Sequence, residues 1–272
     1  MNIPDMLTRG LVCALVVWLA GCAQGVSGSD ASARADAHAG LHTESDETPS
    51  QRRSRIRLEL ATAYFQQGQT HVALDEIKQA MAIDPTYADA YNLRGLVYLR
   101  LNDLPLAAAS FDRALALNPR DADVAHNYAW LQCQQAKYEA AEKLFAQAIA
   151  NPTYAHAAKS WMARGLCQLR AGQPAAAEVS LVRSHALDGT NPVTSYNLAR
   201  MLFERGDFEP AQPYMRQLNK GSLANAETLW LGIQIERQLK NKLAVAALVE
   251  QLRGRFAQSS ELIAYEKGAF HD

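Results

Sequence analysis

Residues 85–119, PTYADAYNLRGLVYLRLNDLPLAAASFDRALALNP, decide the fold, and they begin and end on a proline 34 residues apart. Small and large side chains recur through this stretch at helical spacing. The residues that set the pattern are Ala90, Tyr91, Gly95, Val97 and Tyr98 in the first half and Ala107, Phe111 and Ala114 in the second half. Asn118-Pro119 ends the second half, because proline has no amide hydrogen to donate and disfavours the helical conformation in the residue before it. The stretch therefore predicts two helices joined by a turn.

The spacing of these residues resembles the tetratricopeptide (TPR) repeat, a helix-turn-helix unit of 34 residues. The same frame fits the chain from about Ser54 onward, with two extra residues before the fourth repeat. In the fifth repeat we expect Pro213 to distort the second helix. Because one helix pair cannot bury its apolar face alone, neighbouring pairs must stack. We expect an all-α fold, a right-handed TPR superhelix (α-solenoid) of about six helix-turn-helix repeats, with the last two degenerate and residues 259–272 capping the end.

The amino-terminal residues resemble the export signal of a bacterial lipoprotein. Ten apolar residues, Leu11–Ala20, form a run that is too short to span a bilayer as a helix and that ends in small residues. The tetrapeptide Leu19-Ala20-Gly21-Cys22 resembles a lipobox, in which the cysteine thiol receives a diacylglyceryl group before cleavage. We therefore expect a lipoprotein signal peptide in residues 1–21 and lipidation of Cys22. The alternative is a plain secretory signal that ends by chance in a cysteine.

A lipidated Cys22 would hold the protein on a membrane. The lipoprotein resemblance implies three acyl chains, and two already suffice for stable anchoring. Ala23 follows the cysteine, whereas an aspartate at that position commonly retains proteins of this class at the inner membrane. The resemblance thus implies the outer membrane, with the protein facing the periplasm. Translation from Met1 and from Met6 are both compatible with this signal.

The segment after the lipobox is expected to be a tether. Residues 22–52 comprise the lipidated cysteine and a stretch rich in small and polar residues without helical or strand periodicity, which predicts disorder. The TPR domain is expected over residues 53–272. His38 and His42 could hold a metal ion if the tether were helical, but its composition argues against a helix and favours a polar linker that contains two histidines.

The composition gives no sign of catalysis or of nucleic-acid binding. Lys and Arg number 27 against 28 Asp and Glu, so no polyanion-binding surface is indicated. The chain has no glycine-rich phosphate loop, no His-Glu-x-x-His and no Cys-x-x-Cys. We expect no enzyme, no cofactor, no metal and no small-molecule substrate. A hydrolase with a site hidden between repeats is the alternative from another class.

A partner-binding groove is expected on the first helices of the repeats, which line the concave wall in the TPR family. The inward positions on these helices are mostly apolar, and the candidate groove residues are Leu58, Thr62, Phe65, Asn92, Leu96, Leu99, Trp130 and Leu166. An apolar wall suggests a groove for an extended or helical segment of a partner protein. The alternative is that these side chains simply pack against the neighbouring first helices.

Two cysteines lie on the first helices of adjacent repeats, Cys133 and Cys167. They could pair in an oxidising periplasm. We expect buried free thiols instead, because the two cysteines fall at slightly different steps of the repeat.

The chain from about residue 55 to residue 270 resembles the type IV pilus biogenesis and stability lipoproteins, the pilotins of the PilF/PilW type. The stretches that carry the resemblance are Ile56–Gly68, Asn127–Ala129, Lys137–Ala141 and Leu229–Ile233. This resemblance implies a protein partner, the type IV pilus secretin, which the lipoprotein would help to reach the outer membrane or to assemble into a ring. The alternative is a general TPR scaffold of the envelope that recruits peptidoglycan-remodelling enzymes.

Overall fold

The computed structural model describes residues 47–270, and this part of the chain is all helical, without a β-strand. Its helices are α2 (Pro49–Gln66), α3 (Thr70–Ile83), α4 (Ala88–Arg100), α5 (Leu104–Leu117), α6 (Ala122–Gln134), α7 (Tyr138–Ala150), α8 (Ala157–Arg170), α9 (Pro174–Leu187), α10 (Pro192–Arg205), α11 (Phe208–Lys220), α12 (Ala226–Gln238), α13 (Lys242–Arg255) and α14 (Ser260–Glu266). The predicted all-α solenoid is confirmed.

The turn inside each repeat has the same backbone conformation throughout the array. One residue in every such turn has a positive φ, between 57° and 86°, and these residues are Gly68, Asn102, Ala136, Gly172, Gly206 and Lys240. They recur at intervals of 34 residues, except that the interval from Ala136 to Gly172 is 36. The structure thus contains the six expected helix pairs, with the two extra residues before the fourth.

The first helix begins earlier than the predicted domain boundary at residue 53. Thr48 caps α2, because its hydroxyl accepts from the amide of Gln51 while the Gln51 side chain accepts from the amide of Thr48. Pro49 occupies the first turn, where the missing amide hydrogen removes no helical bond. Residues 49–52 therefore belong to the helical array and not to the tether.

Each of the first five repeats is held together by a large side chain of the second helix that sits on a small residue of the first. In the second repeat Phe111 is fully buried, and a Cβ on Gly95 would lie only 2.5 to 2.7 Å from three carbons of its ring. Ala107 and Ala114, on either side of Phe111 along the helix, are also fully buried. The close approach that Gly95 allows is what closes this helix pair.

The fifth repeat corrects one prediction. Pro213 lies inside α11, yet the helix runs without interruption from Phe208 to Lys220. Proline removes a single helical bond here, the one that the Glu209 carbonyl would accept, and both residues are exposed so that water can replace it. The predicted distortion of this helix is therefore wrong.

The carboxyl end is capped as predicted, over the residues up to 270. Leu262 of α14 is buried against the cluster that contains Leu229 and Ile233 of α12. The ring of Phe270 stacks on Trp230 with the centroids 5.2 Å apart. These contacts cover the apolar face that the last repeat would otherwise leave open.

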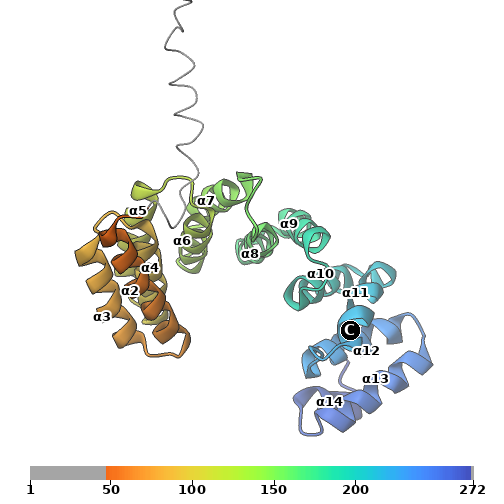
Figure 1. The fold of residues 1–272 in the computed structure, drawn as a ribbon. Helices are drawn as coiled ribbons and strands as arrows, with labels where there is room; N and C mark the ends of the chain where they lie inside the picture. Colours follow the sequence, from red (N-terminus) through yellow and green to blue (C-terminus); the bar gives the residue numbers. More distant parts are fainter. Residues whose placement is uncertain (1–46, 271–272) are drawn as a thin grey trace, which may run out of the picture. The chain divides into compact units, whose positions relative to one another are not determined.

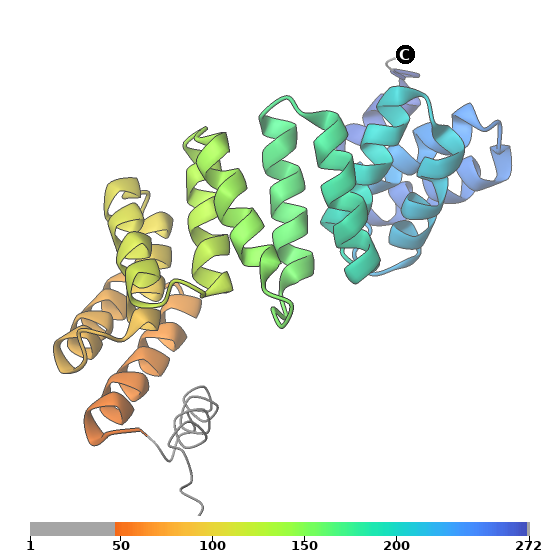
Figure 2. The ribbon, with the colours of Figure 1, turned by 90° about the horizontal axis from the view of Figure 1, so that it is seen from above.

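Residues 48–270 form a curved row of helix pairs, seen from two directions in Figures 1 and 2. In Figure 1, helices α6, α8 and α10 lie on the inner side of the bend, and α7, α9 and α11 lie on its outer side. The first helices of neighbouring repeats are in contact, α2 with α4, α4 with α6 and α6 with α8. They therefore form one continuous wall on which a partner could lie.

Candidate protein-binding site

Most of the predicted groove residues lie on this wall and keep part of their surface exposed. We call the half-buried members the inner stripe, which consists of Thr62, Phe65, Asn92, Leu96, Leu99, Trp130 and Leu166. Leu58 does not belong to it, because only 7% of its surface is exposed and it packs in the core of the first repeat with Ala61 and Ile77. The structure thus removes Leu58 from the candidate groove.

The apolar residues of the stripe use one side to pack within the array and leave the other side accessible. Leu96 and Leu99 rest on the buried cluster around Phe111, and Trp130 rests on the cluster around Phe145. Packing within the array therefore accounts for one side of each of these side chains, and a groove on the exposed side stays a prediction. A rigid apolar wall results, since its residues are fixed from behind by the core.

Arginines stack on two aromatic rings of the stripe, which the sequence analysis did not foresee. The Arg100 guanidinium lies 4.0 Å from the centroid of the Phe65 ring and also donates to the Phe65 carbonyl at 2.6 Å. The Arg170 guanidinium lies 5.0 Å from the centroid of the Trp130 ring. Each arginine comes from the last turn of the following first helix. The stripe therefore alternates apolar surface with cations, which favours a partner that has both apolar and acidic residues.

The polar residues of the stripe are largely satisfied within the protein. The Thr62 hydroxyl donates to the Leu58 carbonyl at 2.8 Å. Asn92 accepts from the side-chain amide of Asn127, on the next first helix, at 3.1 Å. This amide contact links α4 to α6 and leaves the Asn92 NH₂ group available for a partner backbone.

Cys133 and Cys167 form a disulfide, so the expectation of buried free thiols is wrong. Their Cα atoms are 5.8 Å apart, and the bond joins α6 to α8. The two extra residues before the fourth repeat shift its first helix, and this shift brings together two cysteines that are 34 residues apart but occupy different steps. The bond fixes two neighbouring first helices at the middle of the wall.

A polar network joins α6 to α8 and to the turn before α8, and its contact between His126 and Ser160 is buried. His126 Nδ1 and Ser160 Oγ are 2.8 Å apart, and the Tyr154 hydroxyl donates to Asp123 at 3.0 Å. Burial, the largest cause, together with the nearby Lys159 lowers the pKa of His126 to about 4. Ser160 is fully buried, so the serine and histidine are out of reach of a substrate and act as a structural contact between repeats.

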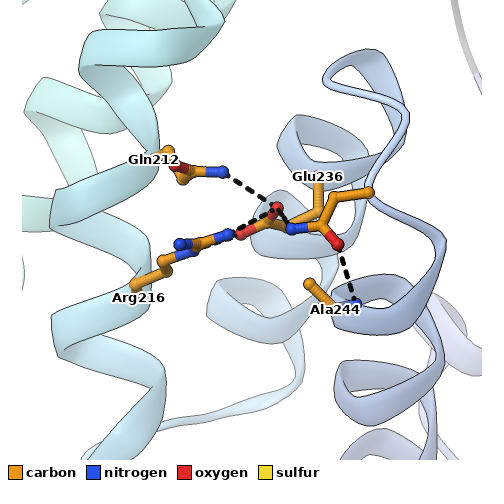
Figure 3. Close-up of polar contacts among 5 residues, drawn as sticks. Gln212, Arg216, Glu236 and Ala244 are labelled. Carbon is orange, nitrogen blue, oxygen red and sulfur yellow. Dashed lines mark hydrogen bonds and ion pairs between the residues drawn. The ribbon is translucent and has the colours of Figure 1, made fainter.

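A second recess, not expected from the sequence, lies between α11 and α13, with α12 contributing to its wall. Its volume is about 280 Å³. Glu236 lines it with only 2% of its surface exposed and accepts from Arg216 at 2.6 and 3.1 Å, from Gln212 at 2.9 Å and from Asn241 at 2.9 Å (Figure 3). Glu236 stands four residues before the turn residue Lys240, at the same step as Gln132 and Gln168 in the third and fourth repeats. The repeat frame alone therefore gives no sign of a buried carboxylate here.

No helix within residues 47–270 is long and apolar enough to cross a membrane. Among the same residues no cluster of His, Cys, Asp or Glu has the arrangement of a metal site. Cys22, His38 and His42 lie outside the described residues.

The repeats match known proteins over most of the array. A tetratricopeptide repeat model matches residues 58–122 and 129–192, and a second one matches residues 110–143. The chain is thus a TPR-repeat protein, as the helix pairs and their turns indicate.

Among its relatives is the type IV pilus assembly protein PilF of Pseudomonas aeruginosa, which is 28% identical over 204 residues, or 75% of this chain and 81% of PilF. A solved P. aeruginosa PilF structure superposes with a TM-score of 0.74 at 25% identity, over 81% of this chain and all of PilF. PilW, described as a widely conserved type IV pilus biogenesis factor, gives a TM-score of 0.68 at 29% identity, over 78% of this chain and 97% of PilW. The recognition made from the sequence is confirmed, and these similarities support a role in type IV pilus biogenesis.

Proposed function

We propose that this protein is an outer-membrane lipoprotein, anchored through Cys22 on the periplasmic face, that binds the type IV pilus secretin through its inner stripe. The lipid anchor holds the TPR array at the membrane, and the stripe captures a segment of the secretin there. Capture at the bilayer raises the local concentration of secretin subunits and so assists their insertion and assembly into a ring. No chemical step is needed for this role.

The observation that carries the proposal is the inner stripe itself, in a chain that spans the whole length of the PilF structure. Leu96 and Leu99 on α4 and Leu166 on α8 are half-exposed apolar side chains, and Trp130 on α6 lies between them in the row of first helices. Half-exposed apolar side chains in a row cost solubility unless a partner covers them, so they mark an interaction surface. The arginines over Phe65 and Trp130 add the charge that orients such a partner.

The anchor is tested by replacing Cys22 with serine and following secretin ring assembly in cells. We expect C22S to release the protein into the periplasm and to reduce the amount of ring strongly. The matched control is C13S, in the apolar run of the signal, which should leave both unchanged. Unchanged rings with C22S would contradict the anchored mechanism.

The stripe is tested by capturing partners from detergent-solubilised envelopes on the purified wild-type chain and on the double variant L96E/L166E. We expect the secretin to be enriched by the wild type and lost with the variant. The matched control is L106E/V182E, which places the same charges on exposed positions of second helices. Enrichment of murein hydrolases in place of the secretin would favour the alternative, a TPR scaffold that recruits peptidoglycan-remodelling enzymes.

A further inference from the structure

The recess between α11 and α13 exists because Gly232 stands where the second repeat carries a long side chain. Counted back from the positive-φ turn residues Lys240 and Asn102, Gly232 occupies the same step as Arg94. The Arg94 guanidinium lies between α3 and α5, where it donates to Ser110 and contacts Met81. Gly232 has no side chain, so a space of about 280 Å³ stays open between the two second helices.

The inside of this recess is mostly apolar. Met215 and Ile235 are nearly or fully buried in its wall, and Ala244, Ala247 and Leu248 of α13 line the facing side. Pockets that hold drug-sized molecules usually measure about 300–1,000 Å³, so a space of this size fits a smaller group such as one aliphatic side chain.

The mouth of the recess is positively charged. All the hydrogen bonds of Arg216 to Glu236 use its Nε and Nη2 atoms, and these bonds raise the pKa of the guanidinium. Lys220 lies one helical turn further along α11 and also lines the recess. Within residues 47–270 no carboxylate forms an ion pair with Lys220. Since Glu236 offsets Arg216, Lys220 leaves one positive charge unmatched at the opening.

The Glu236 carboxylate holds neighbouring helices together and has no free acceptor position for a ligand. Its two oxygens already accept four hydrogen bonds, from Arg216, Gln212 and Asn241. A carboxylate satisfied in this way fixes α11, α12 and the start of α13 at a set distance, as Figure 3 shows. The recess is thereby kept open, and its charge toward a ligand comes from Lys220.

We propose that this recess is a second binding site, for a protein segment that inserts one aliphatic side chain and places a carboxylate next to it. The side chain fills the space between Met215 and Leu248, and the carboxylate meets Lys220 at the opening. The site opens between the second helices α11 and α13 and contains no residue of the inner stripe, so it would hold a segment other than the one on that stripe. It does not depend on the identity of the partner at the stripe.

The test uses N-acetyl-L-leucine, which carries an isobutyl group and a carboxylate, as the probe in saturation-transfer NMR with the purified chain. We expect saturable binding with a Kd in the millimolar range, as is usual for so small a ligand. N-acetyl-L-leucine amide, without the carboxylate, and N-acetylglycine, without the side chain, should each bind at least three-fold more weakly.

Variants of the recess complete the test. A247F fills the space with a ring and should abolish saturable binding, whereas A246F, on the same helix but outside the recess, should not change it. K220Q should weaken N-acetyl-L-leucine about three-fold, and K242Q should not.

Three results would overturn the proposal: no saturation with the wild type, equal binding by wild type and A247F, or equal binding by wild type and K220Q. Self-association of the chain that A247F removes would assign the recess to a second copy and would overturn it too. Loss of probe binding is distinguishable from failure of the proposed function, because secretin capture is measured separately on the stripe variants.

Discussion

The second and sixth repeats share a backbone plan and differ in how they are filled. In both repeats the turn between the helices contains one residue with a positive φ, Asn102 in the second and Lys240 in the sixth. In the second repeat the Arg94 side chain fills the space between α3 and α5, whereas in the sixth Gly232 stands at the same step and leaves a recess between α11 and α13, beside a buried carboxylate. The comparison teaches that the turn and the repeat length set where helices run, while one or two side chains decide whether the space between neighbouring second helices is filled or can receive a ligand.

The largest difference is expected between Phe111, in the core of the second repeat, and Leu248, at the recess of the sixth. F111A should reduce the free energy of unfolding by about 3–5 kcal/mol, because it removes a fully buried ring and leaves a cavity. L248A should cost less than about 2 kcal/mol, since the leucine already borders open space. Urea unfolding, read together with hydrogen exchange for each repeat, measures both. Equal losses would contradict the contrast between a filled core and an open recess.

A smaller loss of stability is expected on removing the disulfide between Cys133 and Cys167, the only disulfide within residues 47–270, which lies at the middle of the array. The double variant C133S/C167S should lose about 2–4 kcal/mol, because the bond closes a loop of 34 residues in the unfolded chain. Hydrogen exchange should rise in α6 and α8 and stay unchanged in α12 and α13. Dithiothreitol should produce the same change in the wild type and none in the double variant.

The pH dependence should also distinguish the two parts of the array. The pKa of His126 is about 4 in the folded chain, against about 6.5 when unfolded, so the unfolded state binds the proton more readily. The neutral histidine contributes full stability above pH 6.5, and roughly 2–3 kcal/mol is lost as the pH falls through 4.

This loss is measured by urea unfolding between pH 7 and pH 4. The variant H126Q should show a flatter profile, although it keeps His156 and Lys159 nearby. A profile as steep as that of the wild type would show that other groups cause the acid sensitivity. Exchange in the sixth repeat should hardly respond in this range.

The smallest contrast concerns the two glycines of the compared repeats. G95A would place a Cβ 2.5 Å from the fully buried ring of Phe111 and should lower the free energy of unfolding by about 1–3 kcal/mol. In G232A the closest atom, at 2.6 Å, is the terminal amide nitrogen of Asn219, and Leu248 follows at 3.3 Å. That side chain can turn, so the expected loss stays below about 1 kcal/mol. Thermal unfolding compares the two variants directly, and a greater loss for G232A would contradict this account.

The regular part of the fold could be predicted because its signals are local. Gly95, Phe111 and Ala114 all lie within one repeat, and so does the turn that joins the two helices of that repeat. The predicted domain boundary at residue 53 is later than the observed helix start at Pro49. The reason is that the capping pair Thr48 and Gln51 precedes the first apolar position of the repeat pattern. Pro213 misled the prediction, since its position near the start of an exposed helix removes only one bond.

The candidate site could be predicted only in outline. Periodicity placed Leu96, Trp130 and Leu166 on the inner wall, but it also placed Leu58 there. Leu58 is buried by the packing of α2 against α3 and α4, which depends on all three helices together. The arginine stacks on Phe65 and Trp130 join residues from different repeats, 35 and 40 positions apart, and no local spacing signals them.

By itself, the sequence determined the repeat length, the order of the helices, the two-residue insertion and the small-on-large packing within each pair. The tertiary structure alone decided that Cys133 and Cys167 are bonded, that Glu236 is buried with four donors, and that a recess opens beside Leu248. The physical reason is that helix formation and pairing follow from neighbours within about 34 residues of sequence. Burial and side-chain pairing follow from the separation and rotation of helices in adjacent repeats, which only the stacked array fixes.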